Sequence, residues 1–411
     1  MTYRSVTRLL LLGVVLACYA LSPGPVEAQP RVVASIDLAP EARWPMAVAV
    51  DPTNNRIYVA NYDTDNVSVI DGATNTVVAT VPVGHGPSEL AVNPATNRIY
   101  VVSTKSDNRI FVIDGATNTV ATTITMDTQP RAVAVDPVTN RVYVTQSDAL
   151  GKEIVVIDGA ANSATRPIVL DSPADDIAVN PHTNRIYVVD GFVEGAADSV
   201  SVVDGRTRRI VAKVPVGRMP LWIVVNALTN RIYVATVGGV SVIDGASNTV
   251  EGTLPSMALA LAVDPATDHI YTFSDNISVY DGATNAIIAT VPLEYQFDSV
   301  IAPNPTTGRV YVTDVSGNKL LVIEDQPAVV STPTAVPTTT QTPAPLKSGA
   351  GPTPDVPIIQ PATGDGPGRS AGSRGVDIAF ALAGGGAGGA LLLAAGGWLA
   401  ARELLRTRAG R

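Results

Sequence analysis

Short apolar runs broken by polar turns recur along the chain between residues 31 and 326. In the first unit these runs are Met46–Val50, Arg56–Ala60, Val67–Ile70 and Thr76–Val83. Residues 52–55 separate the first two runs, and Asp71-Gly72 begins the turn between the last two. Asp-Gly and Asn accept the positive φ angles of tight hairpin turns. The pattern therefore predicts four short antiparallel strands in each unit.

The unit is marked by a nine-residue stretch that reads DPTNNRIYV at residues 51–59. Related copies begin at residues 93, 136, 180, 226, 264 and 304, with spacings of 38 to 46 residues. Four-stranded units of about 40 residues repeated in this way are typical of propeller blades. The sequence predicts an all-β fold, a seven-bladed β-propeller of four-stranded blades spanning residues 29–326.

The seventh unit lacks its last strand, because the chain becomes rich in proline and threonine after Ile323. Residues 32–38, near the other end of the domain, resemble the fourth strand of the first unit at residues 77–83. We therefore expect the N-terminal strand 32–38 to pair with residues 320–323 and close blade seven. Closure of this kind leaves no long free sheet edge.

Residues 1–28 have the features of a secretory signal peptide. Arg4 and Arg8 precede an apolar run at residues 9–20, and Val26-Glu27-Ala28 fits a cleavage site. Cys18 leaves a lipoprotein signal open as an alternative. It is the one cysteine of the chain, so the mature protein is expected to form no disulfide.

The C-terminal segment, residues 327–411, is predicted to anchor the propeller. Residues 327–375 form a Pro/Thr/Gly-rich linker, expected to be a disordered stalk. Residues 376–401 are expected to form one transmembrane helix, since 378–401 carry no charge, and the basic tail 402–411 is expected to be cytoplasmic. The protein is thus expected to be exported and held in the cell membrane by a single pass, with the propeller outside.

A second anchoring route stays open at residues 360–364, which read Gln-Pro-Ala-Thr-Gly. This stretch resembles a cell-wall sorting signal, whose pattern is Leu-Pro-x-Thr-Gly followed by an apolar segment and a basic tail. The resemblance implies cleavage between Thr363 and Gly364 and attachment to the cell wall instead of the membrane.

Charge and composition restrict the partners. The chain has a net charge of −9, and acidic side chains outnumber basic ones 37 to 28. Such a surface repels a phosphate backbone, so no nucleic acid is expected. The three histidines lie in different repeats, so neither a metal nor another cofactor is expected. The ring is expected to be monomeric, with an unknown surface protein, peptide or glycan as ligand.

The candidate binding residues come from the loops that vary between units. Aligning the units puts one set of side chains at or just before the innermost strands, around the expected channel mouth, with Trp44 and His85 nearby. This set comprises Glu89, Arg131, Asp175, Asp176, Trp222 and Asp298. Function on a rigid scaffold concentrates in such loops. No phosphate-binding loop, nucleophile elbow or metal-ligand spacing was found, and no catalytic residue is proposed.

A second recurring feature is an arginine that opens the second strand and an aspartate that closes the third. Antiparallel pairing places both at one rim, and we expect structural ion pairs that fix each blade. The expected pairs are Arg56 with Asp71, Arg98 with Asp114, Arg141 with Asp158, Arg185 with Asp204 and Arg231 with Asp244. His269 breaks this pattern in the sixth unit, and Glu324-Asp325 replaces Asp-Gly in the seventh.

The repeated Thr-Asn-Arg-Ile-Tyr-Val, followed by Val-x-Val-Ile-Asp-Gly-x-Thr-Asn, resembles the YVTN β-propeller repeat family over residues 31–326. Similar proteins are the YncE-like periplasmic proteins and archaeal surface-layer proteins. The resemblance implies an extracytoplasmic seven-bladed propeller acting as a non-catalytic binding or structural module. An alternative is a lactonase-like hydrolase with its site at the channel mouth. A redox propeller is ranked last, because haem and copper ligands are missing.

Overall fold

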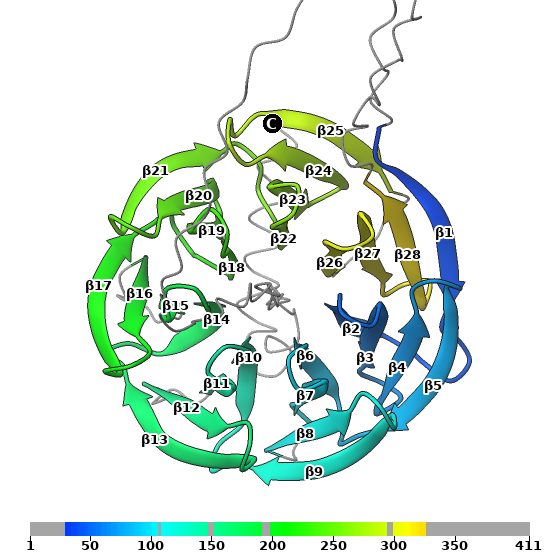
Figure 1. Ribbon diagram of the computed structural model, residues 1–411. Helices are drawn as coiled ribbons and strands as arrows, with labels where there is room; N and C mark the ends of the chain where they lie inside the picture. The colour runs from blue at the N-terminus through cyan, green and yellow to red at the C-terminus, as the bar shows by residue number, and fades with distance from the viewer. Residues whose placement is uncertain (1–28, 106–107, 147–151, 191–197, 294–298, 326–411) are drawn as a thin grey trace, which may run out of the picture.

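The computed structural model describes residues 29–105, 108–146, 152–190, 198–293 and 299–325. Their 28 strands form seven four-stranded antiparallel sheets arranged around one axis (Figure 1). This confirms the seven-bladed β-propeller predicted from the repeats. The first strand of each unit lies innermost and the fourth lies on the outer belt (Figure 1).

Each blade takes its strands in sequence order, except the last. Blade 1 consists of β2 (Pro45–Asp51), β3 (Arg56–Asn61), β4 (Asn66–Asp71) and β5 (Thr76–Pro82). Blade 2 consists of β6 (Pro87–Asn93), β7 (Arg98–Ser103), β8 (Arg109–Asp114) and β9 (Thr119–Thr125). Blade 3 consists of β10 (Pro130–Asp136), β11 (Arg141–Gln146), β12 (Glu153–Asp158) and β13 (Ser163–Val169). Blade 4 consists of β14 (Ala174–Asn180), β15 (Arg185–Asp190), β16 (Ser199–Asp204) and β17 (Arg209–Pro215).

The remaining blades follow the same plan. Blade 5 consists of β18 (Trp222–Asn226), β19 (Arg231–Thr236), β20 (Gly239–Asp244) and β21 (Thr249–Leu254). Blade 6 consists of β22 (Ala260–Asp264), β23 (His269–Phe273), β24 (Asn276–Asp281) and β25 (Ile287–Pro292). Blade 7 is β26 (Ile301–Asn304), β27 (Arg309–Asp314), β28 (Lys319–Glu324) and, from the other end of the domain, β1 (Arg31–Asp37).

The ring closes through β1, which pairs antiparallel with β28 from Arg31 opposite Glu324 to Asp37 opposite Lys319. Ile36 and Leu38 are 5% and 4% exposed, and they share one core cluster with Tyr311 and other buried residues of blades 7 and 1. The N-terminal strand therefore adds apolar contacts as well as a row of backbone hydrogen bonds.

The core consists of layers between neighbouring blades. Both faces of the middle strands are apolar because each sheet packs on a blade at either side. The repeat tyrosines are almost fully buried in these layers: Tyr58, Tyr100, Tyr143, Tyr187, Tyr233, Tyr271 and Tyr311. Their place at one position of every blade makes them packing residues.

The two rims of the ring differ. One rim, here called the constant rim, carries the turns after the first and third strands of each blade. Every first turn ends in a residue with positive φ, from 51° to 66°: Asn55, Asn97, Asn140, Asn184, Asn230, Asp268 and Gly308. Asn and Asp tolerate this conformation best among residues with a side chain. The variable rim carries the loops after the second strands, of two to eight residues, and the connections between blades.

Three predicted segments, the signal peptide 1–28, the linker 327–375 and the helix 376–401 with its tail 402–411, lie outside the described residues. Within the described part of the chain, no helix is long and apolar enough to cross a membrane.

Candidate functional site on the variable rim

The arginine–aspartate pairs expected from the repeats lie on the constant rim, away from the candidate site. Three of the five predicted pairs form ion pairs within their blade, Arg56 with Asp71 at 2.6 Å, Arg98 with Asp114, and Arg185 with Asp204. These contacts lie on the constant rim, where the strands pair in the same register in each blade.

The other two arginines take different partners, which corrects the expected pairing. Arg141 donates to the carbonyl of Gly205 in the next blade at 3.2 Å, although Asp158 is its register partner. Arg231 donates to the carbonyl of Gly282 and forms an ion pair with Glu251 at 2.7 Å. An arginine is long enough to reach either its own blade or the next one, so register alone does not decide its partner.

On the variable rim, the inner strands of blades 2 to 4 bring together most of the predicted charged residues. Arg131 on β10 forms an ion pair with Asp175 on β14, with 2.9 Å between Nη1 and Oδ1. Glu89 stands on β6 in the preceding blade and is 1% exposed. The side chain of Arg131 stays 30% exposed, so this pair is the accessible part of the group.

Asp176, the neighbour of Asp175, joins blades 4 and 5. Its Oδ2 accepts the backbone N–H of Ile223 on β18 at 2.9 Å, and its Oδ1 accepts that of Ile177 at 2.8 Å. The residue is 4% exposed. Burial raises the pKa of Asp176 to about 7, against the lowering effect of these two hydrogen bonds. Asp176 thus ties two inner strands together with a carboxyl group that gains a proton near neutral pH.

Trp222 begins β18, the strand whose amide binds Asp176. It is partly buried and packs on the cluster between blades 5 and 6 that includes Val224 and Tyr233. A partly exposed indole provides a rigid surface for stacking or apolar contact. Asp298 and residues 191–197 of the longest loop lie outside the described residues.

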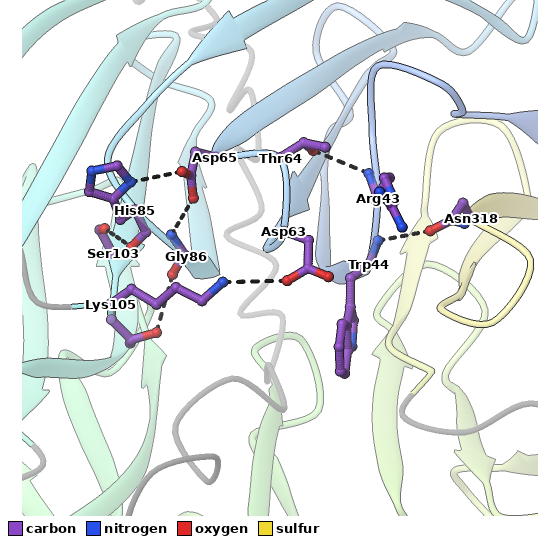
Figure 2. A network of polar contacts seen from close by, with 11 residues as sticks. Arg43, Trp44, Asp63, Thr64, Asp65, His85, Gly86, Ser103, Lys105 and Asn318 are labelled. Carbon is purple, nitrogen blue, oxygen red and sulfur yellow. Dashed lines mark hydrogen bonds and ion pairs between the residues drawn. The ribbon is translucent and has the colours of Figure 1, made fainter.

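A further network lies on the same rim at the junction of blades 1 and 2 (Figure 2). Asp65 bonds His85 Nδ1 at 2.7 Å and the N–H of Gly86 at 2.8 Å. Burial raises the pKa of Asp65, but these two bonds outweigh it and hold it below its usual value. Lys105 Nζ lies 3.3 Å from Asp63.

The aromatic part of this network consists of Trp44 and Tyr62, whose ring centroids are 6.2 Å apart in an edge-to-face arrangement. Lys105 Nζ lies 4.0 Å from the centroid of the Tyr62 ring, a cation–π contact. The backbone N–H of Trp44 donates to Asn318 Oδ1 at 2.9 Å, which fixes the chain where it passes from β1 to β2 (Figure 2).

Trp44 has a φ of 59°, a conformation that is unfavourable for a bulky residue. Gly86 occupies the corresponding place before β6 and has a φ of 63°. A tryptophan where glycine would be unstrained points to a role beyond chain reversal, because strained residues cluster at functional sites. Sequence analysis placed Trp44 and His85 near the site, but Tyr62, Asp63, Asp65 and Lys105 were missed, because nothing in the loop sequences shows that they meet.

The arrangement allows binding chemistry. It offers accessible carboxylates, cationic groups and partly exposed aromatic rings on one rim of a rigid scaffold. His85 is engaged by Asp65 and both oxygens of Asp176 are engaged by amides, so these groups do not form a shared acid–base pair. Across the described residues, no group of three or more His, Cys, Asp or Glu side chains is placed to hold a metal ion.

Comparison with known proteins supports the fold. No family model and no curated protein matches the chain. Among solved structures, Kuenenia stuttgartiensis hydrazine synthase is similar with a TM-score of 0.58 and 16% identity, over 69% of this chain and 96% of that one. Identity at this level shows a shared fold and not a shared activity. The chain is therefore a β-propeller by its fold, and its resemblance to the YVTN repeat family rests on the repeat motif.

Proposed function

We propose that the protein is an exported, surface-anchored binding module that holds a protein, peptide or glycan ligand on the variable rim of its propeller. The observation that carries this proposal is the contrast between the rims. The constant rim repeats nearly the same turn in every blade, with the same backbone conformation. The variable rim carries Trp44, Trp222 and the Arg131–Asp175 pair, which are not repeated. One specific site needs this loss of symmetry.

The geometry favours binding over the lactonase-like alternative. General acid–base catalysis needs a titratable pair within reach of one substrate atom. His85 is held at the junction of blades 1 and 2, whereas Asp176 is held between blades 4 and 5. The structural role of Asp176 leaves the accessible Arg131–Asp175 pair and Trp222 as the ligand contacts in this part of the rim.

Replacing Trp222 with alanine is expected to weaken ligand binding by about 2 kcal/mol, or roughly 30-fold in Kd. A partly exposed aromatic anchor loses its contact area with the ligand, while the tyrosine layers between the blades remain. The measurement is titration of a ligand first found by screening glycan and peptide arrays with the full chain.

Val138→Ala provides the control for this experiment, because Val138 is 67% exposed in a turn of the constant rim. It should leave Kd unchanged. If Val138→Ala weakens binding and Trp222→Ala does not, the ligand binds the opposite rim. Equal thermal unfolding of both variants and the parent protein excludes a folding defect as the cause.

Anchoring is tested separately in cells. Deleting residues 376–411 is expected to release the propeller into the medium, because the apolar segment and the basic tail would be gone. Replacing Thr363 and Gly364 with alanine distinguishes the two anchors, because sortase cleavage needs this bond. If the unchanged protein is already full length in the membrane fraction and the replacement changes nothing, the membrane route holds. If the replacement moves the protein from the wall fraction to the membrane fraction, the sorting route holds.

A further inference from the structure

Two departures from the repeat meet at the junction of blades 6 and 7. In blades 1 to 6 a glycine follows the third strand and lies against the last residue of the first turn. A Cβ atom on these glycines would lie only 2.0 to 2.6 Å from that side chain: Gly72, Gly115, Gly159, Gly205, Gly245 and Gly282. In blade 7 the glycine and the residue with the polar side chain have exchanged positions. Gly308 ends the first turn and Asp325 occupies the glycine position, with its N–H still bonded to the Gly308 carbonyl at 2.9 Å.

The exchange gives Asp325 room for a side chain, and its carboxylate points back to blade 6. Oδ2 lies 2.7 Å from His269 Nδ1 and also accepts the hydroxyl of Tyr271. Asp325 is 3% exposed. His269 stands where the other six blades have arginine (Arg56, Arg98, Arg141, Arg185, Arg231 and Arg309). The permanent cation of the repeat is thus replaced by one that depends on a proton.

Negative groups face His269 from every element packed around it. Asp264 at the end of β22 is 1% exposed, Asp268 precedes β23, and Asp281 on β24 is the register partner of His269. Asp325 after β28 completes the set. Tyr271 on β23 is neutral, because burial raises the pKa of its hydroxyl, and it donates to Asp325. Arg231 of blade 5 acts on Asp268. A proton on His269 therefore neutralises part of a buried negative cluster.

We propose that His269 and Asp325 form a proton-dependent latch that fastens blade 7, the blade completed by both ends of the domain, to blade 6. With the proton present, the carboxylate of Asp325 has a charged hydrogen-bond partner. When the proton leaves, Asp325 remains a buried anion beside a neutral imidazole, and the end of β28 is held less firmly. Buried charges without a charged partner are costly, which gives the latch its strength.

The direction of the pH effect follows from the charges. Burial lowers the pKa of His269, but the hydrogen bond and charge of Asp325, with Asp264 and Asp281, outweigh it and raise the pKa above 6.5. A raised pKa means that the contribution is complete below pH 6.5 and is lost as the pH rises through the folded value. Burial also raises the pKa values of Asp264 and Asp268 above 3.8. Their contribution to stability is therefore also lost as the pH rises, beginning at lower pH than that of His269. The latch is therefore closed below pH 6.5 and weakens as the pH rises above that value.

Hydrogen exchange on the full chain tests the latch. The opening constant of the Asp325 amide, corrected for intrinsic exchange, is expected to rise by up to about tenfold per pH unit above pH 6.5, the limit for one linked proton. The Gly72 amide, bonded to the Asn55 carbonyl at 2.9 Å, is the matching site in blade 1 and should show no such rise. Equal pH dependence of the two amides would overturn the proposal.

Substitutions test whether His269 is the titrating group behind the pH dependence of the Asp325 amide. His269→Arg restores the cation of the other blades and should abolish the pH dependence at Asp325 while keeping it protected. His269→Gln should also abolish it, with opening at acidic pH as fast as in the unchanged protein at alkaline pH. His85→Gln removes the exposed histidine paired with Asp65 and should leave the dependence intact. Persistence of the pH dependence in His269→Arg would contradict the latch. Should a variant not fold, the comparison of Asp325 with Gly72 in the unchanged protein still decides.

Discussion

Replacing Ile36 with alanine is expected to lower the free energy of unfolding by about 2–5 kcal/mol, a large part of the stability of a domain. Ile36 is 5% exposed on β1 and belongs to the cluster that joins blades 7 and 1. Its truncation leaves a cavity at the closing joint of the ring. Chemical denaturation followed by circular dichroism measures the change.

The control for this prediction lies on the same strand. Val33 is 40% exposed on the outer belt, so Val33→Ala should change the free energy of unfolding by less than about 0.5 kcal/mol. Similar losses in both variants would mean that the burial of Ile36 at the joint is not the source of the effect. A negligible effect of Ile36→Ala would show that the ring stays closed without the apolar side of this strand.

Raising the pH from about 4 to 8 is expected to destabilise the protein through Asp176 by on the order of 4 kcal/mol, about 1.4 for each unit of pKa shift. Burial raises the pKa of this carboxyl group from 3.8 to about 7. Because the folded pKa lies above the unfolded one, the contribution is complete below pH 3.8 and is lost as the pH rises through about 7. Denaturation curves at several pH values measure it.

Two substitutions isolate this contribution from other titrating groups. Asp176→Asn has no proton to lose and should flatten the difference in stability between pH 4 and 8. Asp175→Asn changes the neighbouring carboxylate, which is paired with Arg131, and should retain the dependence. If the curves of Asp176→Asn and the unchanged protein run parallel, the buried carboxyl group is not the source.

Much of the fold could be predicted because one repeat encodes it seven times. Alternating apolar runs and Asp-Gly turns determine the strands, and a missing last strand identifies residues 32–38 as the closing one. The side-chain partners were less predictable. Arg141 and Asp158 stand opposite each other in register, yet the arginine reaches a carbonyl in the next blade. Such a choice depends on distances across the blade interface, which the repeat pattern does not contain.

The site shows the same limit. Sequence alignment placed Glu89, Arg131 and Asp175 on neighbouring inner strands, but it did not show that Asp176 is a structural link whose oxygens hold two backbone amides. Both departures at His269 and Asp325 were visible in the sequence. Their contact was not, because the residues are 56 positions apart and belong to different blades.

The joint between β1 and β28 has a consequence for the order of the chain. Arg31 and Glu324 are register partners, so both ends of the propeller lie side by side at the constant rim. A short linker joining residue 325 to residue 31 would span only this gap, and new termini could open in any other turn of the same rim. The propeller is thus suited to circular permutation. The pairing of its strands does not depend on which of these turns holds the two ends of the domain.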